Sequence, residues 1–261
     1  MGCTMEKIKI SIITITYNSE KTLRDTLESV RNQHYSNLEY IIVDGESSDS
    51  TMDMVNQYSD IVSKCISEKD NGISDAMNKG IHMASGDLIG IIHSDDMLAN
   101  GALDRLNQEW DGRADVYYGN AIICDRAGKY THILSSESDL SKMPYRFSIV
   151  HPATFVTKKC YDTLGVFDLQ YKCAMDYDLL LRFYRAGAIF KYIDASLAVY
   201  REGGTNQKYR ERTIDEVCTV SIRNGGNPLI ANFVKMKKKM KDAIKPVTRR
   251  LHINNRRVKQ I

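Results

Sequence analysis

The sequence predicts an α/β protein with a doubly wound, mostly parallel sheet, a small antiparallel portion and a basic helical tail. First, apolar segments of strand length alternate with helical segments four times in the first part of the chain. Second, each strand segment ends in polar residues, which is typical of the ligand-binding edge of a parallel sheet. With 43% hydrophobic and 26% charged residues, the 261-residue chain has enough apolar material for a substantial core.

The first half of the chain contains the four strand–helix units. We expect strands at residues 7–15, 38–43, 61–67 and 87–92. We expect helices to begin at residues 20, 48–50 and 74 and near residue 100, where Ser, Asp or Asn favours a helix start. Because parallel strands share one carboxyl edge, Tyr17, Asp44, residues 68–70 and Asp95 are predicted to converge there.

The second half gives fewer signals. Two strand segments, 116–124 and 129–134, flank the turn residues 125–128 and predict a hairpin. A helix is expected to begin near Asp176, followed by strands at residues 190–192 and 197–200. No GxGxxG and no Walker loop is present, so the sequence indicates neither a dinucleotide site nor a P-loop site.

The net charge of +3 conceals a strongly basic tail. From Lys235 onward the chain has eleven Lys or Arg and one acid, whereas the preceding residues have 25 basic and 32 acidic side chains. Between Leu229 and Ile244, apolar side chains recur at helical spacing, namely Leu229, Phe233, Met236, Met240 and Ile244. The tail, residues 228–261, therefore either binds an anionic membrane surface through 229–259 or packs its stripe on the domain. Nucleic-acid binding is disfavoured, because the basic run lacks aromatics and the main domain is acidic.

The first nine residues lack the apolar core of a signal peptide, and no apolar run reaches the ~20 residues of a membrane span. The six cysteines are scattered without zinc-ligand spacing, which indicates reduced core thiols. We expect a cytoplasmic protein that can sit peripherally on the inner face of the cell membrane.

A carboxylate pair follows the strand at 87–92, in the run His93-Ser94-Asp95-Asp96. Two adjacent like charges are costly unless a cation or solvent offsets them. Mg²⁺ and Mn²⁺ prefer oxygen ligands and commonly share one or two carboxylates with substrate phosphates. The alternative is that these residues only cap the helix near Asn100.

Four motifs occur in order: Ile15-Thr16-Tyr17-Asn18, the turn at 43–51, the segment Ser67 to Gly80, and Ser94-Asp95-Asp96. On these the sequence resembles family-2 glycosyltransferases of the GT-A fold over residues 7–205. The run SEKDNGISDAMNKG is similar to the subgroup found in bacterial capsule, exopolysaccharide and lipopolysaccharide gene sets, including colanic-acid transferases. The resemblance implies a domain at 1–227, with a nucleotide-sugar-binding half at 1–111 and an acceptor-side half at 112–206.

The resemblance also implies residue roles. The nucleotide-sugar-binding residues would be Thr16, Tyr17, Asn18, Asp44, Asp70, Asn71, Asp75, Ser94 and Arg201. Tyr17 would lie against the base and Asp44 would accept a hydrogen bond from the ring N–H of the base. Asp95 would ligate a divalent Mn or Mg ion on the sugar-nucleotide diphosphate, with Asp96 beside it. Each of three residues also has a purely structural alternative. Tyr17 would be a tyrosine at the rim of the sheet, Asp44 would form a turn, and Asp75 would be an acid in the first turn of a helix.

This chain departs from the family pattern at two positions. His93 stands where the first Asp of the Asp-x-Asp motif is usual; it would ligate the metal, hydrogen-bond the ribose or merely finish the strand. Met175 replaces a usual Glu, and Asp176 matches the catalytic base. Asp178 is the rival base, although it would also suit a pair with Arg182 four residues later.

Two further features stay open in the sequence. His151 is either a structural histidine or part of the acceptor pocket. Residues 201–206, basic and Gly-rich, form either a lid over the diphosphate or a solvent loop.

We therefore expect an inverting glycosyltransferase that uses a nucleotide-diphosphate sugar, UDP-linked by preference. Its acceptor would be a saccharide, plausibly lipid-linked, in bacterial surface polysaccharide synthesis. The alternatives are a degenerate sugar-nucleotide-binding scaffold and a sugar-phosphate nucleotidyltransferase. The latter calls for a Gly-rich basic loop after the first strand, which Thr16-Tyr17-Asn18-Ser19-Glu20 is not.

Overall fold

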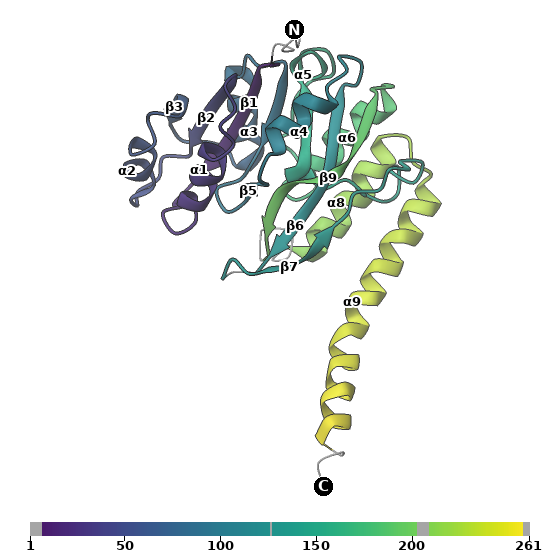
Figure 1. Cartoon of the computed structure of the whole chain (residues 1–261). Helices are drawn as coiled ribbons and strands as arrows, with labels where there is room; N and C mark the ends of the chain where they lie inside the picture. Colours follow the sequence, from purple (N-terminus) through teal and green to yellow (C-terminus); the bar gives the residue numbers. More distant parts are fainter. Residues whose placement is uncertain (1–6, 126, 203–208, 258–261) are drawn as a thin grey trace.

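A computed structural model describes residues 7–125, 127–202 and 209–257, with side chains as far as Asp242. The described residues form one nine-stranded mixed sheet with helices on both faces (Figure 1). The strands are β1 (Ile10–Thr16), β2 (Leu38–Asp44), β3 (Val62–Ser67), β4 (Leu88–Ile91), β5 (Met97–Leu98), β6 (Val116–Cys124), β7 (Tyr130–Leu134), β8 (Thr154–Thr157) and β9 (Phe190–Arg201). The helices are α1 (Leu23–Arg31), α2 (Thr51–Asn56), α3 (Ile73–Met83), α4 (Ala102–Glu109), η1 (His151–Ala153), α5 (Lys158–Leu164), α6 (Met175–Arg185), α8 (Arg210–Arg223) and α9 (Pro228–Arg257).

The first four strands are parallel, as predicted. β1 pairs with β2 and β4, and β2 pairs with β3. The register places Thr16 beside Asp44, and Asp44 beside Ser67. The polar strand ends therefore meet on one edge of the sheet, which confirms the predicted convergence.

The second half of the sheet contains more antiparallel pairing than the sequence suggested. β6 and β9 are parallel, but β8 runs antiparallel between β4 and β6, and β5 and β7 are also antiparallel to their partners. The two short strands expected near residues 190–200 form one continuous strand, β9. The α/β fold class is confirmed, with a larger antiparallel portion than predicted.

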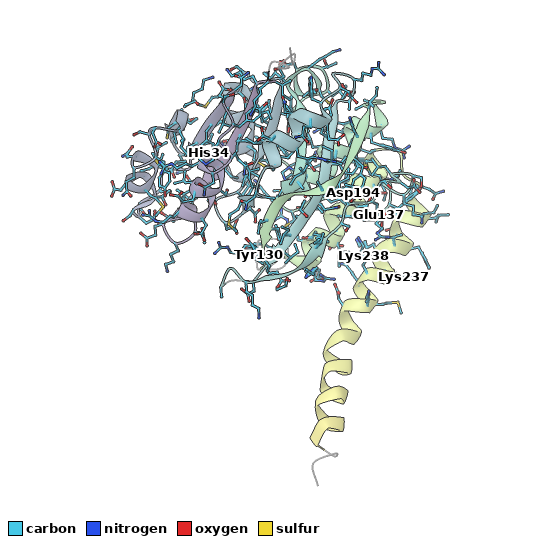
Figure 2. The ribbon with its side chains drawn as sticks, viewed as in Figure 1. His34, Tyr130, Glu137, Asp194, Lys237 and Lys238 are labelled. Atoms are coloured by element: carbon cyan, nitrogen blue, oxygen red, sulfur yellow. The ribbon has the colours of Figure 1, made fainter. Side chains whose placement is uncertain are left out.

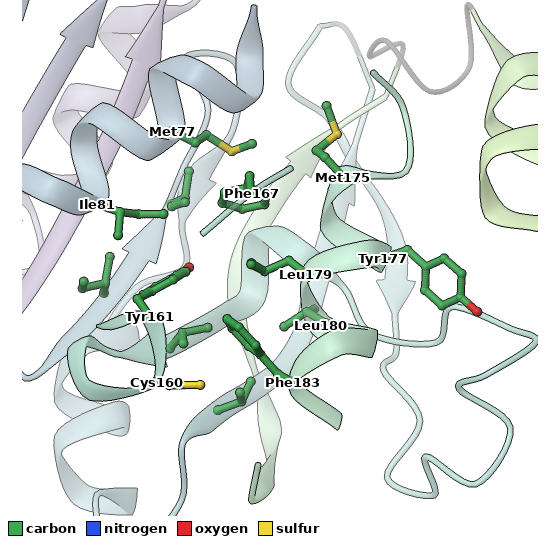
Figure 3. Packing of buried hydrophobic residues seen from close by; sticks show 14 of the residues in the cluster. Met77, Ile81, Cys160, Tyr161, Phe167, Met175, Tyr177, Leu179, Leu180 and Phe183 are labelled. Atoms are coloured by element: carbon green, nitrogen blue, oxygen red, sulfur yellow. The ribbon is translucent and has the colours of Figure 1, made fainter. Parts of the chain in front are cut away.

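Two apolar clusters cover the two faces of the sheet. Successive residues of β1 point to opposite faces, so that Ile12 packs in one cluster with Leu27, and Ile13 packs in the other with Met77. The second cluster joins α3, α5 and α6, and Figure 3 shows Met77, Phe167 and Leu179 within it. Burial on both faces explains why β1 is an apolar run without full alternation.

The tail forms the helix that its periodicity predicted, and α9 extends away from the domain (Figure 1). The alternative in which its apolar stripe packs on the domain is wrong for the described side chains, because Leu229, Phe233, Met236 and Met240 are exposed. Ile244 lies outside the described side chains. Within the described ranges, every helix is too short or too polar to cross a bilayer. The five described cysteines are free thiols, as expected, although Cys65 is exposed.

Candidate active site

Two adjoining hollows lie at the edge where β1, β2 and β4 end. The larger cleft, of about 750 Å³, is lined by residues that include Thr16, Tyr17, Asn18, Gly45, Lys69, Asp70, Ser94 and Asp95. The smaller cavity, of about 160 Å³, is lined by Ile73, Met77, His93, Asp95, Asp96, His151, Pro152, Lys172, Met175, Asp176 and Tyr200. Ile73, His93 and Asp95 line both hollows, so they stand at the junction.

The β1 end shapes the wall of the large cleft. Tyr17 is 66% exposed, so that its ring is available to stack against a ligand. Asn18 adopts a left-handed conformation with φ of 49°, which asparagine tolerates better than most residues. Its side-chain oxygen accepts a hydrogen bond from the Ser48 N–H at 2.9 Å. Asn18 thus braces the turn after β2 while Tyr17 faces solvent.

Asp44, at the end of β2, is fully buried behind the cleft. Its carboxylate accepts four hydrogen bonds, from the Thr16 hydroxyl, the Ser67 hydroxyl, and the N–H and hydroxyl of Ser47. Burial alone would raise the pKa of Asp44, but these hydrogen bonds outweigh it and hold the pKa below its ordinary value. A carboxylate has about four acceptor positions, so Asp44 is saturated within the protein.

The loop before α3 brings one predicted residue into the cleft and uses two others to hold the loop. Asp70 lines the cleft, and its carboxylate accepts the Gly72 N–H at 2.7 Å. Asp75 accepts hydrogen bonds from the backbone and the side chain of Asn71, at 2.9 and 3.2 Å. A Cβ on Gly45 would lie 2.5 Å from an Asp70 oxygen, so a larger residue there would displace the Asp70 carboxylate from its present position.

The residues after β4 have different environments. The Ser94 hydroxyl lies 2.8 Å from the Ser19 hydroxyl, and Asp95 lines both hollows. Asp96 is only 3% exposed, and its carboxylate accepts the Arg201 N–H at 3.1 Å. Burial and the nearby Asp95 hold the pKa of the Asp96 carboxyl well above its ordinary value. Asp95 is therefore better suited than Asp96 to ligate a cation.

His93 and His151 face each other edge to face, with ring centroids 6.3 Å apart. Burial, followed by the neighbouring His151, lowers the pKa of His93 to about 4. Burial also lowers the pKa of His151 to about 4, so both rings are neutral at pH 7. The His93 Nε2 is buried without a hydrogen-bond partner among the described residues, beside the small cavity that both rings line.

Asp176 lies in the first turn of α6 and lines the small cavity together with Asp95. Burial raises the pKa of Asp176 to about 6. The rival carboxylate, Asp178, is 4% exposed and accepts a hydrogen bond from the Arg182 Nε at 2.9 Å. The pair with Arg182 forms as the helical spacing suggested, and Asp178 lines neither hollow.

Arg201 lies at the end of β9, outside the lining of both hollows. Its guanidinium pairs with Asp25 at 2.7 Å, and its backbone N–H binds Asp96. Residues 203–206 of the predicted lid lie outside the described residues. Arg201 therefore braces the acidic turn in this structure, and its contact with a diphosphate remains a prediction.

The carboxylates at this edge suit a metal ion that is coordinated in part by the substrate. In the part of the chain that the structure describes, no three His, Cys, Asp or Glu side chains gather as a ready-made metal cluster. Asp95 nevertheless faces the junction of the hollows, and Mg²⁺ is often bound by one or two carboxylates together with substrate phosphates and water. The residues present fit such a shared site.

The sequence analysis did not identify Lys172 or Tyr200 as site residues. Lys172 lines the small cavity and donates to the Asn71 carbonyl at 3.2 Å, so that it links the α3 loop to the start of α6. Tyr200 lies one residue before Arg201 on β9. The only available signal was their closeness in sequence to Asp176 and Arg201.

Curated relatives of this chain are named as glycosyltransferases. The PGL/p-HBAD biosynthesis glycosyltransferase of Mycobacterium tuberculosis is 27% identical over 223 residues, covering 82% of this chain and 86% of the relative. The Bacillus subtilis relative named as the glycosyltransferase EpsH is 31% identical over 128 residues, covering 48% of this chain and 36% of the relative.

Two solved structures share the fold. Staphylococcus aureus TarS matches with a TM-score of 0.65 and 18% identity, covering 87% of this chain and 42% of that chain. The Pyrobaculum calidifontis mannosyltransferase PcManGT, in complex with GDP-Man and Mn²⁺, matches with a TM-score of 0.64 and 15% identity, covering 90% of this chain and 70% of that chain. At such low identity these matches show the GT-A fold alone. A family model described as Glycosyl transferase family 2 matches residues 11–175, most of the chain, and this protein therefore belongs to that glycosyltransferase family.

Proposed function

We propose that this glycosyltransferase moves a hexosyl group, with inversion, from a nucleotide-diphosphate sugar to a lipid-linked saccharide in bacterial surface polysaccharide synthesis. A UDP-sugar is the preferred donor. The observation that carries the proposal is that Asp95 and Asp176 line one small cavity, which adjoins the cleft bearing Tyr17. This arrangement provides a place for a nucleoside, a diphosphate and a sugar in sequence along the edge of the sheet.

The large cleft suits the nucleoside. The exposed Tyr17 ring offers stacking area, and Asp70, which also approaches Gly45, offers a carboxylate oxygen beside it. Asp44 supports this wall from behind, because its four hydrogen bonds tie together the ends of β1, β2 and β3. The diphosphate then lies near Ser94 and Asp95, at the junction of the hollows.

Asp95 is the residue that would hold a divalent metal, together with the phosphate oxygens of the donor. Such a metal, when bound, offsets the charge that develops on the leaving diphosphate. The neutral His93 ring adds no negative charge beside this group, and its buried Nε2 can hydrogen-bond the bound donor.

Asp176 acts as the general base. Its pKa of about 6 lets it remain ionised at neutral pH, yet makes it a stronger base than an ordinary aspartate. It accepts the proton of the acceptor hydroxyl while that oxygen attacks the anomeric carbon and the nucleotide diphosphate departs. A single displacement of this kind inverts the anomeric configuration, as it does in inverting glycosidases.

The ligands bound in the similar solved structures support the donor class. TarS has been solved in complexes with UDP-GlcNAc and with UDP, and the mannosyltransferase with GDP-Man and Mn²⁺. The mycobacterial relative is named for PGL/p-HBAD biosynthesis, and the part of EpsH that aligns is about a third of its length. We propose a lipid-linked acceptor, and we also propose that the protein lies at the inner face of the cell membrane.

The test is hydrolysis of UDP-, GDP- and dTDP-sugars with and without Mn²⁺, followed by transfer to a lipid-linked saccharide. We expect slow, metal-dependent release of UDP from one donor and loss of that release in Asp95→Ala. Asp176→Asn should bind the same donor with unchanged affinity, while transfer falls by about 10²- to 10⁴-fold. Absence of donor binding and turnover in the unmodified chain would instead favour a degenerate sugar-nucleotide-binding scaffold.

A further inference from the structure

The helix α9 presents an apolar face to solvent. Four residues form this face, which we call the outer stripe: Leu229, Phe233, Met236 and Met240, with exposures of 81, 60, 54 and 56%. They recur at steps of four, three and four, so they lie along one side of the helix. Single exposed apolar side chains are ordinary, but an aligned row on one helix marks an interaction surface.

The opposite side of α9 is fixed to the domain. Ala231 is 3% exposed, and Lys235 and Lys239 each approach an Asp215 oxygen of α8 to 2.8 Å. Arg210 of α8 pairs with Asp242 further along α9, with one N–O distance of 2.8 Å. Because these contacts hold the inner side, the outer stripe cannot turn toward the domain without breaking several ion pairs.

The flank of the outer stripe is basic. Lys237 and Lys241 are exposed and lie one residue after Met236 and Met240, so they border the stripe along the same side of the helix. Lys237 lies on the part of α9 that leaves the domain (Figure 2). The segment from Lys235 onward carries eleven basic residues and one acid. The surface therefore combines an apolar row with positive charge.

We propose that the outer stripe binds an anionic lipid bilayer, with Met236, Met240 and Phe233 entering the headgroup region and the lysines facing acidic lipids. An apolar face bordered by Lys or Arg is the composition that favours an interfacial helix. A second copy is a poorer occupant, because pairing two such stripes brings their lysine rows together and like charges repel. An anionic membrane satisfies both parts of the surface.

The position of α9 links this surface to the active-site edge. The carboxyl ends of β6 and β9 meet through the hydrogen bond from the Glu202 N–H to the Cys124 carbonyl, and Arg201 there binds Asp96. Figure 1 shows the β6–β7 hairpin and α9 extending toward the same end of the molecule. Because an interfacial helix lies in the plane of the membrane, a chain held by the outer stripe would keep its active-site edge directed along the bilayer surface. This consequence deepens the proposed function, whereas lipid binding itself does not depend on it.

The experiment is flotation of the full-length protein with phosphatidylglycerol–phosphatidylethanolamine vesicles and with phosphatidylcholine vesicles. We expect binding to the anionic vesicles only, weakening as salt rises. Met236→Gln with Met240→Gln should lower the partition coefficient on the order of tenfold, because exposed helical Gln keeps the helix but removes apolar area. Met236→Leu with Met240→Leu is the matched control and should bind normally. Lys237→Gln with Lys241→Gln should weaken binding by a similar factor, and the two Arg replacements should not.

Circular dichroism would verify that helix content is unchanged in each variant, and donor hydrolysis in solution should equal that of the unmodified chain. Equal binding to both vesicle types, or unchanged binding in the Gln pair, would overturn the proposal. It would also be overturned by a concentration-dependent dimer that the Gln pair dissolves while no vesicle is bound. Because hydrolysis is measured separately, failure of lipid binding is distinguishable from failure of the proposed enzyme activity.

Discussion

Asp44 offers a sharp test, because its structural and ligand-binding roles predict different results for Asp44→Asn. In the structure its oxygens accept four hydrogen bonds, from Thr16, Ser67 and two groups of Ser47. An amide keeps one acceptor oxygen, which would stay opposite the Ser47 N–H at the Oδ2 position. Its NH₂ would then face the Thr16 and Ser47 hydroxyls, which now donate to Oδ1.

The magnitude follows from the lost charge of the acceptor. A hydrogen bond to a charged group contributes about 1.5–3 kcal/mol and a neutral one about 0.5–1.5 kcal/mol, so Asn weakens the bonds that it keeps and requires the Thr16 and Ser47 hydroxyls to rotate and accept. We expect Asp44→Asn to lower the free energy of unfolding by about 2–3 kcal/mol at pH 7, measured by urea denaturation. Asp53→Asn, an exposed acid on α2, is the control and should change it by less than about 0.5 kcal/mol.

The pH dependence adds an internal check. The pKa of Asp44 is lower in the folded protein than in the unfolded chain, so its stabilisation is full above the unfolded value of about 4. The stability difference between the two proteins should shrink as pH falls through the lowered folded-state pKa. If Asp44→Asn instead unfolds at the same urea concentration and only weakens donor binding, the carboxylate reads the base directly and our structural interpretation fails.

Three further predictions concern the site and the core. Burial raises the pKa of Asp176 to about 6, and in the proposed mechanism its ionised form accepts the proton, so kcat/KM for transfer should rise with pH through about 6 and level off above it. A profile that is flat between about pH 5 and 7 would exclude Asp176 as the base. Binding of the sugar donor in the presence of Mn²⁺, measured by calorimetry, should be weaker for Asp95→Asn and nearly normal for Asp96→Asn, because the Asp96 carboxylate is buried against the Arg201 N–H. Equal losses of donor affinity would mean that both carboxylates bind metal. Gly80→Ala would place a Cβ 2.4 Å from Ile13 Cγ2. The overpacking should cost about 1–3 kcal/mol, more than the ~1 kcal/mol gained in helix propensity, and should therefore lower the melting temperature. A higher melting temperature would show that α3 and β1 can move apart at little cost.

Much of the first half of the chain was predictable because its signals are local. Apolar runs with the length of strands identified β1 to β4, and polar residues after them identified the edge where Tyr17, Asp70 and Asp95 now line the hollows. Parallel pairing then follows from the intervening helices, since a parallel pair needs a crossover connection. The ion pair of Asp178 with Arg182 was also predictable, because a spacing of four residues brings the two side chains together on a helix.

The directions of individual side chains, and contacts between residues distant in the chain, could not be predicted from the sequence. Asp95 and Asp96 are adjacent, but only tertiary packing decides that Asp96 turns inward to the Arg201 N–H, 105 residues away. In the same way, the periodicity of the tail identified a stripe without showing which side of the helix the domain covers. That side is set by Asp215, on a helix that the sequence signals did not reveal.

The environment of the small cavity explains how three carboxyl groups can coexist there. Burial and the Asp95 charge raise the pKa of Asp96, which shifts this carboxyl toward its protonated form and reduces the negative charge in the cavity. An aspartate at position 93 would add one more carboxylate beside Asp95 and would raise the pKa of Asp176 further by like-charge repulsion. The neutral His93 avoids that charge while keeping a polar atom at the cavity wall. The departure from the Asp-x-Asp pattern is thus compatible with catalysis, because it leaves Asp176 ionised at neutral pH and still basic enough to accept the acceptor's proton.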